Sequence, residues 1–202
     1  MERVGDRMVR EGRFTGWEAC MLLGRDVYAK TLGIVGCGRI GRAIARRASG
    51  FGIKTRYHNR KRLDRSVEQK LRIEYSDFDD LLNGSDYIVI SVPLTDETRH
   101  LFTLTQFKKM KPSAVLVNIG RGPVVKEDDL VEALNSGLIW GGGLDVYEFE
   151  PDIAKGLAAC PRTTLLPHLG SASTETRTAM ANMAIQAVID TLEGKTPKNQ
   201  VN

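Results

Sequence analysis

The sequence has few cysteines and no long apolar run, and each shortage excludes a class of protein. Its three cysteines, Cys20, Cys37 and Cys160, are odd in number and widely spaced, which excludes a disulfide framework and a paired-cysteine zinc site. We therefore expect no metal centre and a reducing, cytoplasmic setting. The charged start, Met1–Gly5, lacks the apolar segment of a signal peptide, and no apolar run is long enough to span a membrane.

The composition is that of a globular protein with one local excess of positive charge. Of the 202 residues, 42% are hydrophobic and 27% are charged, and the net charge is +4. The segment from Lys54 to Arg65 holds six basic residues and one acid, so it alone carries +5. Because the excess is local, we expect no nucleic-acid partner and no membrane surface as partner. The segment is either a solvated face or a pocket for one phosphate.

Short β-branched runs alternate with helical patterns along most of the chain. This alternation predicts a doubly wound parallel sheet of the α/β class, because continuous apolar strands are typical of sheets buried on both faces. The expected strands are 32–36, 54–58, 87–92, 114–119, 139–146 and 163–166, and the expected helices are 40–50, 77–83, 105–110, 127–135 and 174–193. We assign residues 31–170 to the sheet domain, 1–30 to a linking helix and arm, and 171–202 to a final helix and tail.

A glycine-rich turn joins the first expected strand to the first expected helix. Gly36, Gly38 and Gly41 form a G-x-G-x-x-G pattern in the context that dinucleotide binding requires. The first glycine permits a tight turn, the second lets the backbone approach a pyrophosphate, and the third lets the helix pack closely on the strand. We therefore expect the turn, with Arg39 and Ile40, to bind a dinucleotide, and Cys37 to be a small filler.

The end of the second expected strand favours NADP(H) over NAD(H). In NAD sites an acidic residue about 20 positions beyond the turn accepts hydrogen bonds from the ribose, but Asn59 stands there. Asparagine does not repel a 2′-phosphate, and Arg60 can pair with one. We expect NADP as the preferred cofactor, with NAD possible, and His58 as a neighbour of the ribose or adenine.

Five motifs in order make residues 30–171 resemble the D-isomer-specific 2-hydroxyacid dehydrogenases. They are Lys30–Gly36, Val92–Thr98, Val117–Gly122, Leu144–Pro151 and Pro167–Gly170. The resemblance implies a dinucleotide domain of the Rossmann type and hydride transfer between the cofactor and a small 2-keto or 2-hydroxy acid. The Tyr57–Arg60 run is similar to the NADPH-dependent branch that reduces glyoxylate and hydroxypyruvate.

The resemblance also implies a catalytic set of Arg121, Glu150 and His168. Arg121 matches the residue that binds the substrate carboxylate, His168 the acid that protonates the carbonyl oxygen, and Glu150 the carboxylate that orients the histidine. The chemistry needs these types, because arginine offers a planar fork to a carboxylate and histidine exchanges protons near neutral pH. Each residue alone would more often be structural, but all three follow strand ends, where open α/β sheets bind ligands.

Other positions are assigned through the same motifs. Cofactor contacts are implied at Val92, Pro93, Thr98, Ile119, Asp145 and Gly170. Residues 12–17 resemble an arm that contributes to dimers, so a homodimer is expected. Family members carry a substrate domain built mainly before the dinucleotide domain, and we expect most of it to be missing here. A non-catalytic module that binds or senses a dinucleotide therefore remains an alternative to a reductase.

Overall fold

The computed structural model describes residues 2–201, so Met1 of the expected arm and Asn202 of the expected tail lie outside it. The chain divides into two compact units, and the boundary along the sequence lies between Leu165 and Leu166.

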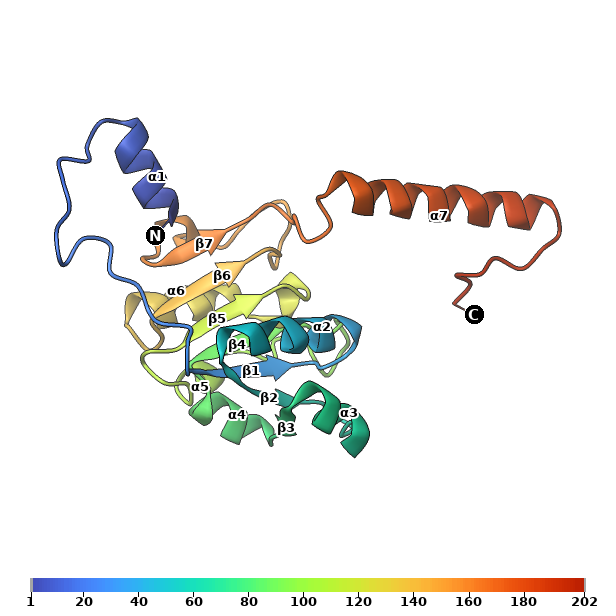
Figure 1. Ribbon diagram of the computed structural model, residues 1–202, viewed down its shortest axis with the longest axis horizontal. Coiled ribbons are helices and arrows are strands. Elements are labelled where there is room, and N and C mark those ends of the chain that lie inside the picture. Colours follow the sequence, from blue (N-terminus) through green and yellow to red (C-terminus); the bar gives the residue numbers. More distant parts are fainter. Residues whose placement is uncertain (1, 202) are drawn as a thin grey trace. The chain divides into compact units, whose positions relative to one another are not determined.

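The first unit is built on a seven-stranded parallel sheet in the order β3-β2-β1-β4-β5-β6-β7 (Figure 1). Its strands are β1 Thr31–Val35, β2 Lys54–His58, β3 Ile73–Tyr75, β4 Tyr87–Ile90, β5 Val115–Asn118, β6 Gly141–Leu144 and β7 Thr163–Leu165. Its α-helices are α1 Glu2–Arg10, α2 Arg39–Ala48, α3 Arg65–Leu71, α4 Phe78–Gly84, α5 Leu104–Phe107 and α6 Glu127–Asn135, with short 3-10 turns at Ser49–Phe51, Gly122–Val124 and Leu157–Ala159. The predicted doubly wound parallel sheet is confirmed.

The sheet buries a separate apolar cluster on each face, because alternate strand residues point to opposite sides. On one face, Leu32 and Ile34 of β1 pack with Ala45 of α2. On the other, Val35 packs with Leu81 of α4 and Leu130 of α6. Both faces of the strands are therefore occupied, as their continuous apolar sequences predicted.

The sequence predicted six strands, and the structure has a seventh. Helix α3 and strand β3 were not expected, because β3 has only three residues and alternates apolar Ile73 with exposed Glu74. Strand β3 pairs with β2 and lies at the edge of the sheet. Its presence makes α3 the crossover that follows the basic loop after β2.

The second unit contains one long helix, α7 Thr174–Leu192. Ser173 caps this helix by accepting a hydrogen bond from the Thr176 N–H at 3.1 Å. Its apolar side chains, among them Met180, Met183 and Val188, are exposed.

Candidate active site

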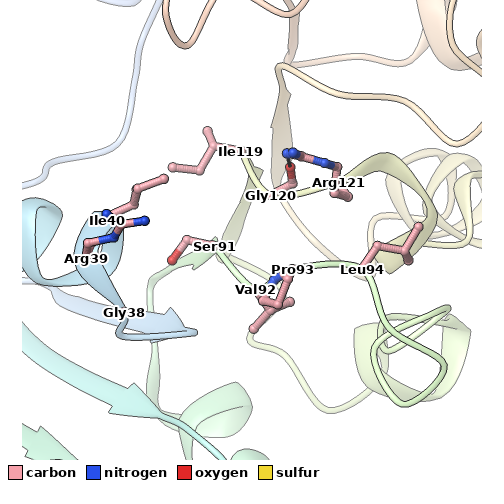
Figure 2. Close-up of a pocket in the computed structure, with 10 residues that line it drawn as sticks. All are labelled: Gly38, Arg39, Ile40, Ser91, Val92, Pro93, Leu94, Ile119, Gly120 and Arg121. Carbon is pink, nitrogen blue, oxygen red and sulfur yellow. Dashed lines mark hydrogen bonds between the residues drawn. The ribbon is translucent and has the colours of Figure 1, made fainter. Parts of the chain in front are cut away.

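A cavity of about 670 Å³ opens where β1, β4 and β5 end (Figure 2). It is lined by Gly38, Arg39, Ile40, Ser91, Val92, Pro93, Leu94, Ile119, Gly120 and Arg121. Neighbouring strands β1 and β4 belong to the two halves of the sheet, and the chain leaves them in opposite directions. Open α/β sheets bind ligands at such a switch point. The cavity brings the glycine turn, the loop after β4 and Arg121 together.

The three glycines of the turn differ in what a side chain would meet at each position. Gly36 has a φ of +95°, and a Cβ there would meet the Ser91 backbone at 2.9 Å. A Cβ on Gly41 would lie 2.5 Å from the Gly36 carbonyl oxygen. Gly38 has a φ of −77°, and a Cβ there would meet no atom within 4 Å. Two glycines are therefore needed by the fold, whereas Gly38 keeps space open in the cavity.

The residues around Gly38 fit the pyrophosphate of a dinucleotide. Helix α2 begins at Arg39, its first turn contains no acidic residue, and no side chain caps it. Its first N–H groups and the positive end of the helix dipole can therefore face an anion. The Arg39 side chain also lines the cavity. An open Cβ position beside uncapped N–H donors is the arrangement that a bound pyrophosphate requires.

Cys37 is held inside the turn by two features. It is fully buried, and burial raises the pKa of its thiol to about 11. The thiol is therefore protonated at neutral pH, which agrees with the predicted role of filler. Its backbone N–H donates to Asn59 Oδ1 at 2.6 Å. Asn59 thus ties the end of β2 to the glycine turn, a role that the sequence did not predict.

The other two residues predicted at the end of β2 differ in exposure, because His58 is half-buried and Arg60 is exposed. The His58 ring lies 5.4 Å from the ring of Phe78, and its Nδ1 is 3.0 Å from the Ser76 carbonyl oxygen. Arg60 is exposed and forms no hydrogen bond or ion pair with any residue from 2 to 201. The pKa of Glu97 is lowered chiefly by a hydrogen bond from Thr95, and the charge of Arg60 lowers it further. The charge of Arg60 therefore acts on a residue of the loop that follows β4.

The loop after β4 is stiffened by Thr98. The Thr98 hydroxyl donates to the Pro93 carbonyl oxygen at 2.7 Å and accepts from the Thr95 N–H at 2.8 Å. Val92 and Pro93, which were predicted to contact the cofactor, line the cavity with Ser91 and Leu94 beside them. The Ser91 hydroxyl donates to the Gly36 carbonyl oxygen at 2.6 Å, so the loop is tied directly to the glycine turn.

Arg121 stands on a turn that a buried asparagine closes. Asn118 is 1% exposed, and its amide donates to the Arg121 carbonyl oxygen and accepts from the Gly120 N–H, both at 3.0 Å. The exposed Arg121 guanidinium donates to the Gly120 carbonyl oxygen at 2.8 Å, and Figure 2 shows it at the edge of the cavity beside Ile119. Sequence reasoning gave Asn118 no role, although an asparagine directly after a strand and before glycine is a turn signal.

The loop that carries Glu150 lies against the Arg121 turn. A Cβ on Gly122 would overlap the Tyr147 carbonyl group, so only glycine allows these two backbones to touch. Glu150 is exposed, and its Oε1 accepts from the Tyr147 N–H at 3.0 Å. The peptide bond between Glu150 and Pro151 is cis. Contact between the two backbones brings the loops of Arg121 and Glu150 together.

A buried glutamate that the sequence did not single out fixes the Glu150 loop at both ends. Glu127 is 1% exposed, and its carboxylate accepts from the N–H groups of Glu148 and Ala154. In return, Glu148 Oε2 accepts from the Glu127 N–H at 2.9 Å, and its Oε1 lies 2.6 Å from His100 Nε2. We name this set of contacts the Glu127–Glu148 bracket, and His100, which was given no role from the sequence, belongs to it. In the sequence, Glu127 is visible only as an acidic residue at the start of a helix, and this pattern does not reveal which groups its carboxylate contacts.

The remaining predicted residues lie at β6 and in the second unit. Asp145 is buried directly after β6, and its N–H donates to the Asn118 carbonyl oxygen at 3.1 Å. His168 and Gly170 belong to the second unit, where His168 has a φ of +53° and is exposed. The first unit therefore assembles the Arg121 and Glu150 loops with the cavity, and the role of His168 stays a prediction.

Metal-binding clusters and membrane-spanning helices are both absent from residues 2–201. No group of three or more histidine, cysteine, aspartate or glutamate side chains is arranged to hold a metal ion in this part of the chain. None of its helices has both the length and the apolar content needed to cross a membrane.

Nearly the whole chain is similar in sequence to known proteins. It is 46% identical over 201 residues to a glyoxylate reductase of Thermococcus onnurineus, covering 98% of this chain and 60% of the relative. It is 47% identical over 196 residues to a glyoxylate/hydroxypyruvate reductase B of Shigella boydii, covering 96% of this chain and 60% of the relative. A crystal structure of a glyoxylate reductase from Paecilomyes thermophila superposes with a TM-score of 0.85 at 40% identity, over 95% of this chain and 57% of that one.

These matches agree with a family model. The chain spans about 60% of the length of the curated relatives it matches. The model of the D-isomer specific 2-hydroxyacid dehydrogenase NAD binding domain matches residues 3–170, which include the cavity, the glycine turn and all five motifs. The chain therefore belongs to the family of D-isomer-specific 2-hydroxyacid dehydrogenases.

Proposed function

We propose that this chain supplies the cofactor domain and catalytic side chains of a reductase for small 2-keto acids such as glyoxylate or hydroxypyruvate. The observation that carries the proposal is the position of Arg121, which lines the same cavity as Gly38 and the start of α2. A cation at the far end of a dinucleotide cavity is placed to hold the carboxylate of a substrate. When bound, the nicotinamide cofactor supplies the hydride.

The chain's own residues supply the other parts of the reaction. The Arg121 guanidinium pairs with the substrate carboxylate through its planar fork, which orients the adjacent carbonyl group. His168 donates a proton from its ring to the carbonyl oxygen as negative charge develops there. Glu150 is the carboxylate that orients the ring of that histidine. The bracket of Glu127 and Glu148 supports this assignment, because it fixes the loop on which Glu150 stands.

A turnover assay tests the catalytic part of the proposal. The purified chain is mixed with NADPH and glyoxylate or hydroxypyruvate, and the loss of NADPH absorbance is followed. Activity that falls at least about a hundredfold in His168→Ala, with NADPH affinity unchanged, is expected for a general acid. His168→Ala turning over at the wild-type rate would overturn the role of His168. NADPH binding without turnover by the wild type would favour the alternative of a dinucleotide-binding module.

NADP(H) is the proposed cofactor, with NAD(H) as a weaker alternative. Support comes from the end of β2, where Asn59 is engaged with the glycine turn and Arg60 and Lys61 are exposed. Arg60→Ala is expected to weaken NADPH binding by about 1–3 kcal/mol through loss of a charge-assisted pair, with NADH binding unchanged. Equal losses for both cofactors, measured by calorimetry, would refute the phosphate role of Arg60.

A homodimer is the proposed assembly. Supporting features lie on the arm between α1 and β1, where the Trp17 side chain is 83% exposed and Phe14 and Leu23 are also exposed. Beside the arm, an apolar groove of about 300 Å³ is lined by Val27, Ile44 and other residues. Aromatic side chains of this kind are enriched in interfaces. Trp17→Ser is expected to shift the mass in sedimentation from dimer to monomer, and an unchanged mass would argue against this arm as the contact.

The compartment is proposed to be the cytoplasm. All three cysteines are free, and Cys37 and Cys160 are buried, which is usual where thiols are kept reduced. Fluorescence from a tagged chain in its native cells is the direct test, and exclusion from the cytoplasm would overturn the proposal.

A further inference from the structure

The short loop after β2 is held between two fixed points. At one end, Asn59 accepts from the Cys37 N–H at 2.6 Å, which ties the loop to the glycine turn. At the other, the Arg62 guanidinium donates through Nε and Nη2 to the two oxygens of Glu68, each at 2.8 Å. Only Arg60 and Lys61 lie between these points, and both are exposed.

The second fixed point is a closed set of hydrogen bonds, which we name the Tyr57–Arg62–Glu68 clamp. The Tyr57 hydroxyl donates to Glu68 Oε1 at 2.6 Å and accepts from the Leu63 N–H at 2.9 Å. Tyr57 is fully buried and Glu68 is 7% exposed. The clamp therefore holds the loop by a side chain at Arg62 and by the backbone at Leu63, from a strand and a helix that belong to the core.

The state of the clamp is constant over the physiological pH range. The hydrogen bonds from Arg62 and Tyr57 lower the pKa of Glu68 to about 2. Burial, followed by the bond to Glu68, raises the pKa of Tyr57 to about 12. Glu68 is thus ionised and Tyr57 protonated near neutrality, as the observed donors and acceptors require. Arg62 also lies over the Tyr75 ring, 5.6 Å from its centre, which fixes its plane.

The clamp separates the basic residues of the loop into two kinds. Two donors of Arg62 are committed to Glu68, so its charge is paired with the Glu68 carboxylate although the Arg62 side chain itself stays partly exposed. Arg60 forms no hydrogen bond or ion pair with residues 2–201 and is positioned near Glu97 of the loop after β4. Arg60 and Lys61 are therefore the basic residues left to meet a ligand, and Arg62 is the residue that sets where they stand.

We propose that the Tyr57–Arg62–Glu68 clamp is a positioning device that determines specificity for the 2′-phosphate of NADPH over the 2′-hydroxyl of NADH. This proposal rests on the cofactor preference proposed above. The clamp lowers the entropy lost when Arg60 meets the phosphate, because the loop is already ordered. NADH has no 2′-phosphate, so its affinity does not depend on this order.

Glu68→Gln separates positioning from simple electrostatics, because the two predict opposite signs. The substitution removes a negative charge near the phosphate site, so a purely electrostatic role predicts tighter NADPH binding. A positioning role predicts weaker NADPH binding, by about fivefold or more for the loss of preorganisation, with the NADH dissociation constant changed less than about twofold. Glu74→Gln on neighbouring β3 makes the same charge change at an exposed side chain outside the clamp, and it is the matched control.

Tyr57→Phe is the second variant, because it keeps the buried ring and the net charge. It removes the bonds to Glu68 and to the Leu63 N–H, and the same selective loss of NADPH affinity is expected, together with a lower midpoint of thermal unfolding. Both dissociation constants are measured by calorimetry on the 202-residue chain at a temperature where circular dichroism shows each variant folded.

The outcomes distinguish this inference from the function on which it rests. A selective loss of NADPH affinity in both clamp variants, absent in Glu74→Gln, supports the clamp. Variants that lose stability but keep the wild-type ratio of NADH to NADPH dissociation constants overturn it and leave the preference for NADPH intact. Equal wild-type affinities for the two cofactors overturn the cofactor preference and the clamp proposal together.

Discussion

The two halves of the site each depend on one buried glutamate, but the two glutamates have different partners. In the cofactor half, at the ends of β1, β2 and β4, Glu68 binds the side chains of Arg62 and Tyr57. In the reaction half, at the ends of β5 and β6, Glu127 binds the backbone N–H groups of Glu148 and Ala154.

The difference indicates what each half has to hold. Backbone N–H donors fix the path of a loop whatever its side chains are, so Glu127 holds the Glu150 loop in one conformation. Side-chain donors fix particular residues instead, so the Tyr57–Arg62–Glu68 clamp holds Arg62 directly and Leu63 through the Tyr57 hydroxyl.

Removing the Glu127 carboxylate should damage the reaction half most. In Glu127→Ala the buried N–H groups of Glu148 and Ala154 lose their acceptor, and leaving two donors unsatisfied should lower the free energy of unfolding by about 2–5 kcal/mol. Urea denaturation measures the loss. Asp128→Ala, at the exposed neighbour on the same helix, should change stability by less than about 0.5 kcal/mol. Similar losses of unfolding free energy in the two variants would show that Glu127 does not stabilise the protein through these hydrogen bonds.

The contrast between Glu127 and the glycine turn also marks what sequence could reveal. The turn was predictable, because the three glycines stand at a fixed spacing between a strand and a helix. Strand β3 was not predictable, because three residues carry too little pattern. Glu127, Glu148 and His100 were missed because their contacts join positions 21 to 48 residues apart. Asn59 was identified as a non-acid at the right place, but its bond to Cys37 depends on the register of β1 and β2.

Two glycines of the cofactor half should separate folding from binding. In Gly41→Ala the new Cβ meets the Gly36 carbonyl, and overpacking should cost about 1–3 kcal/mol of stability. In Gly38→Ala the Cβ enters open space, so stability should change by less than about 1 kcal/mol. The same Cβ should weaken NADPH binding about tenfold or more, which is about 1.4 kcal/mol. Thermal unfolding and calorimetry measure the two quantities, and unchanged affinity in Gly38→Ala would argue against a pyrophosphate at this turn.

The Glu68 clamp should lose its stabilising effect in acid. The folded pKa of Glu68 is about 2, below its usual value of 4.5, so its contribution is fully present above pH 4.5 and is lost as the pH falls towards 2. The difference in unfolding free energy between the wild type and Glu68→Gln should therefore shrink between pH 4.5 and pH 2. Urea titrations at several pH values follow this difference. A difference that stays constant through this range would mean that the carboxylate is not stabilised by its partners.

The smallest effect is expected at Thr98, which acts only within the loop after β4. Thr98→Val keeps the shape of the side chain but removes its hydrogen bonds with Pro93 and Thr95. Because Thr98 is half-exposed and water can replace these partners, the loss of stability should be about 0.5–1.5 kcal/mol. NADPH affinity should fall only about twofold, since Ser91 still ties this loop to Gly36. Calorimetry measures the affinity. A loss of NADPH affinity as large as that of Gly38→Ala would show that cofactor binding depends on the loop after β4 as much as on the glycine turn.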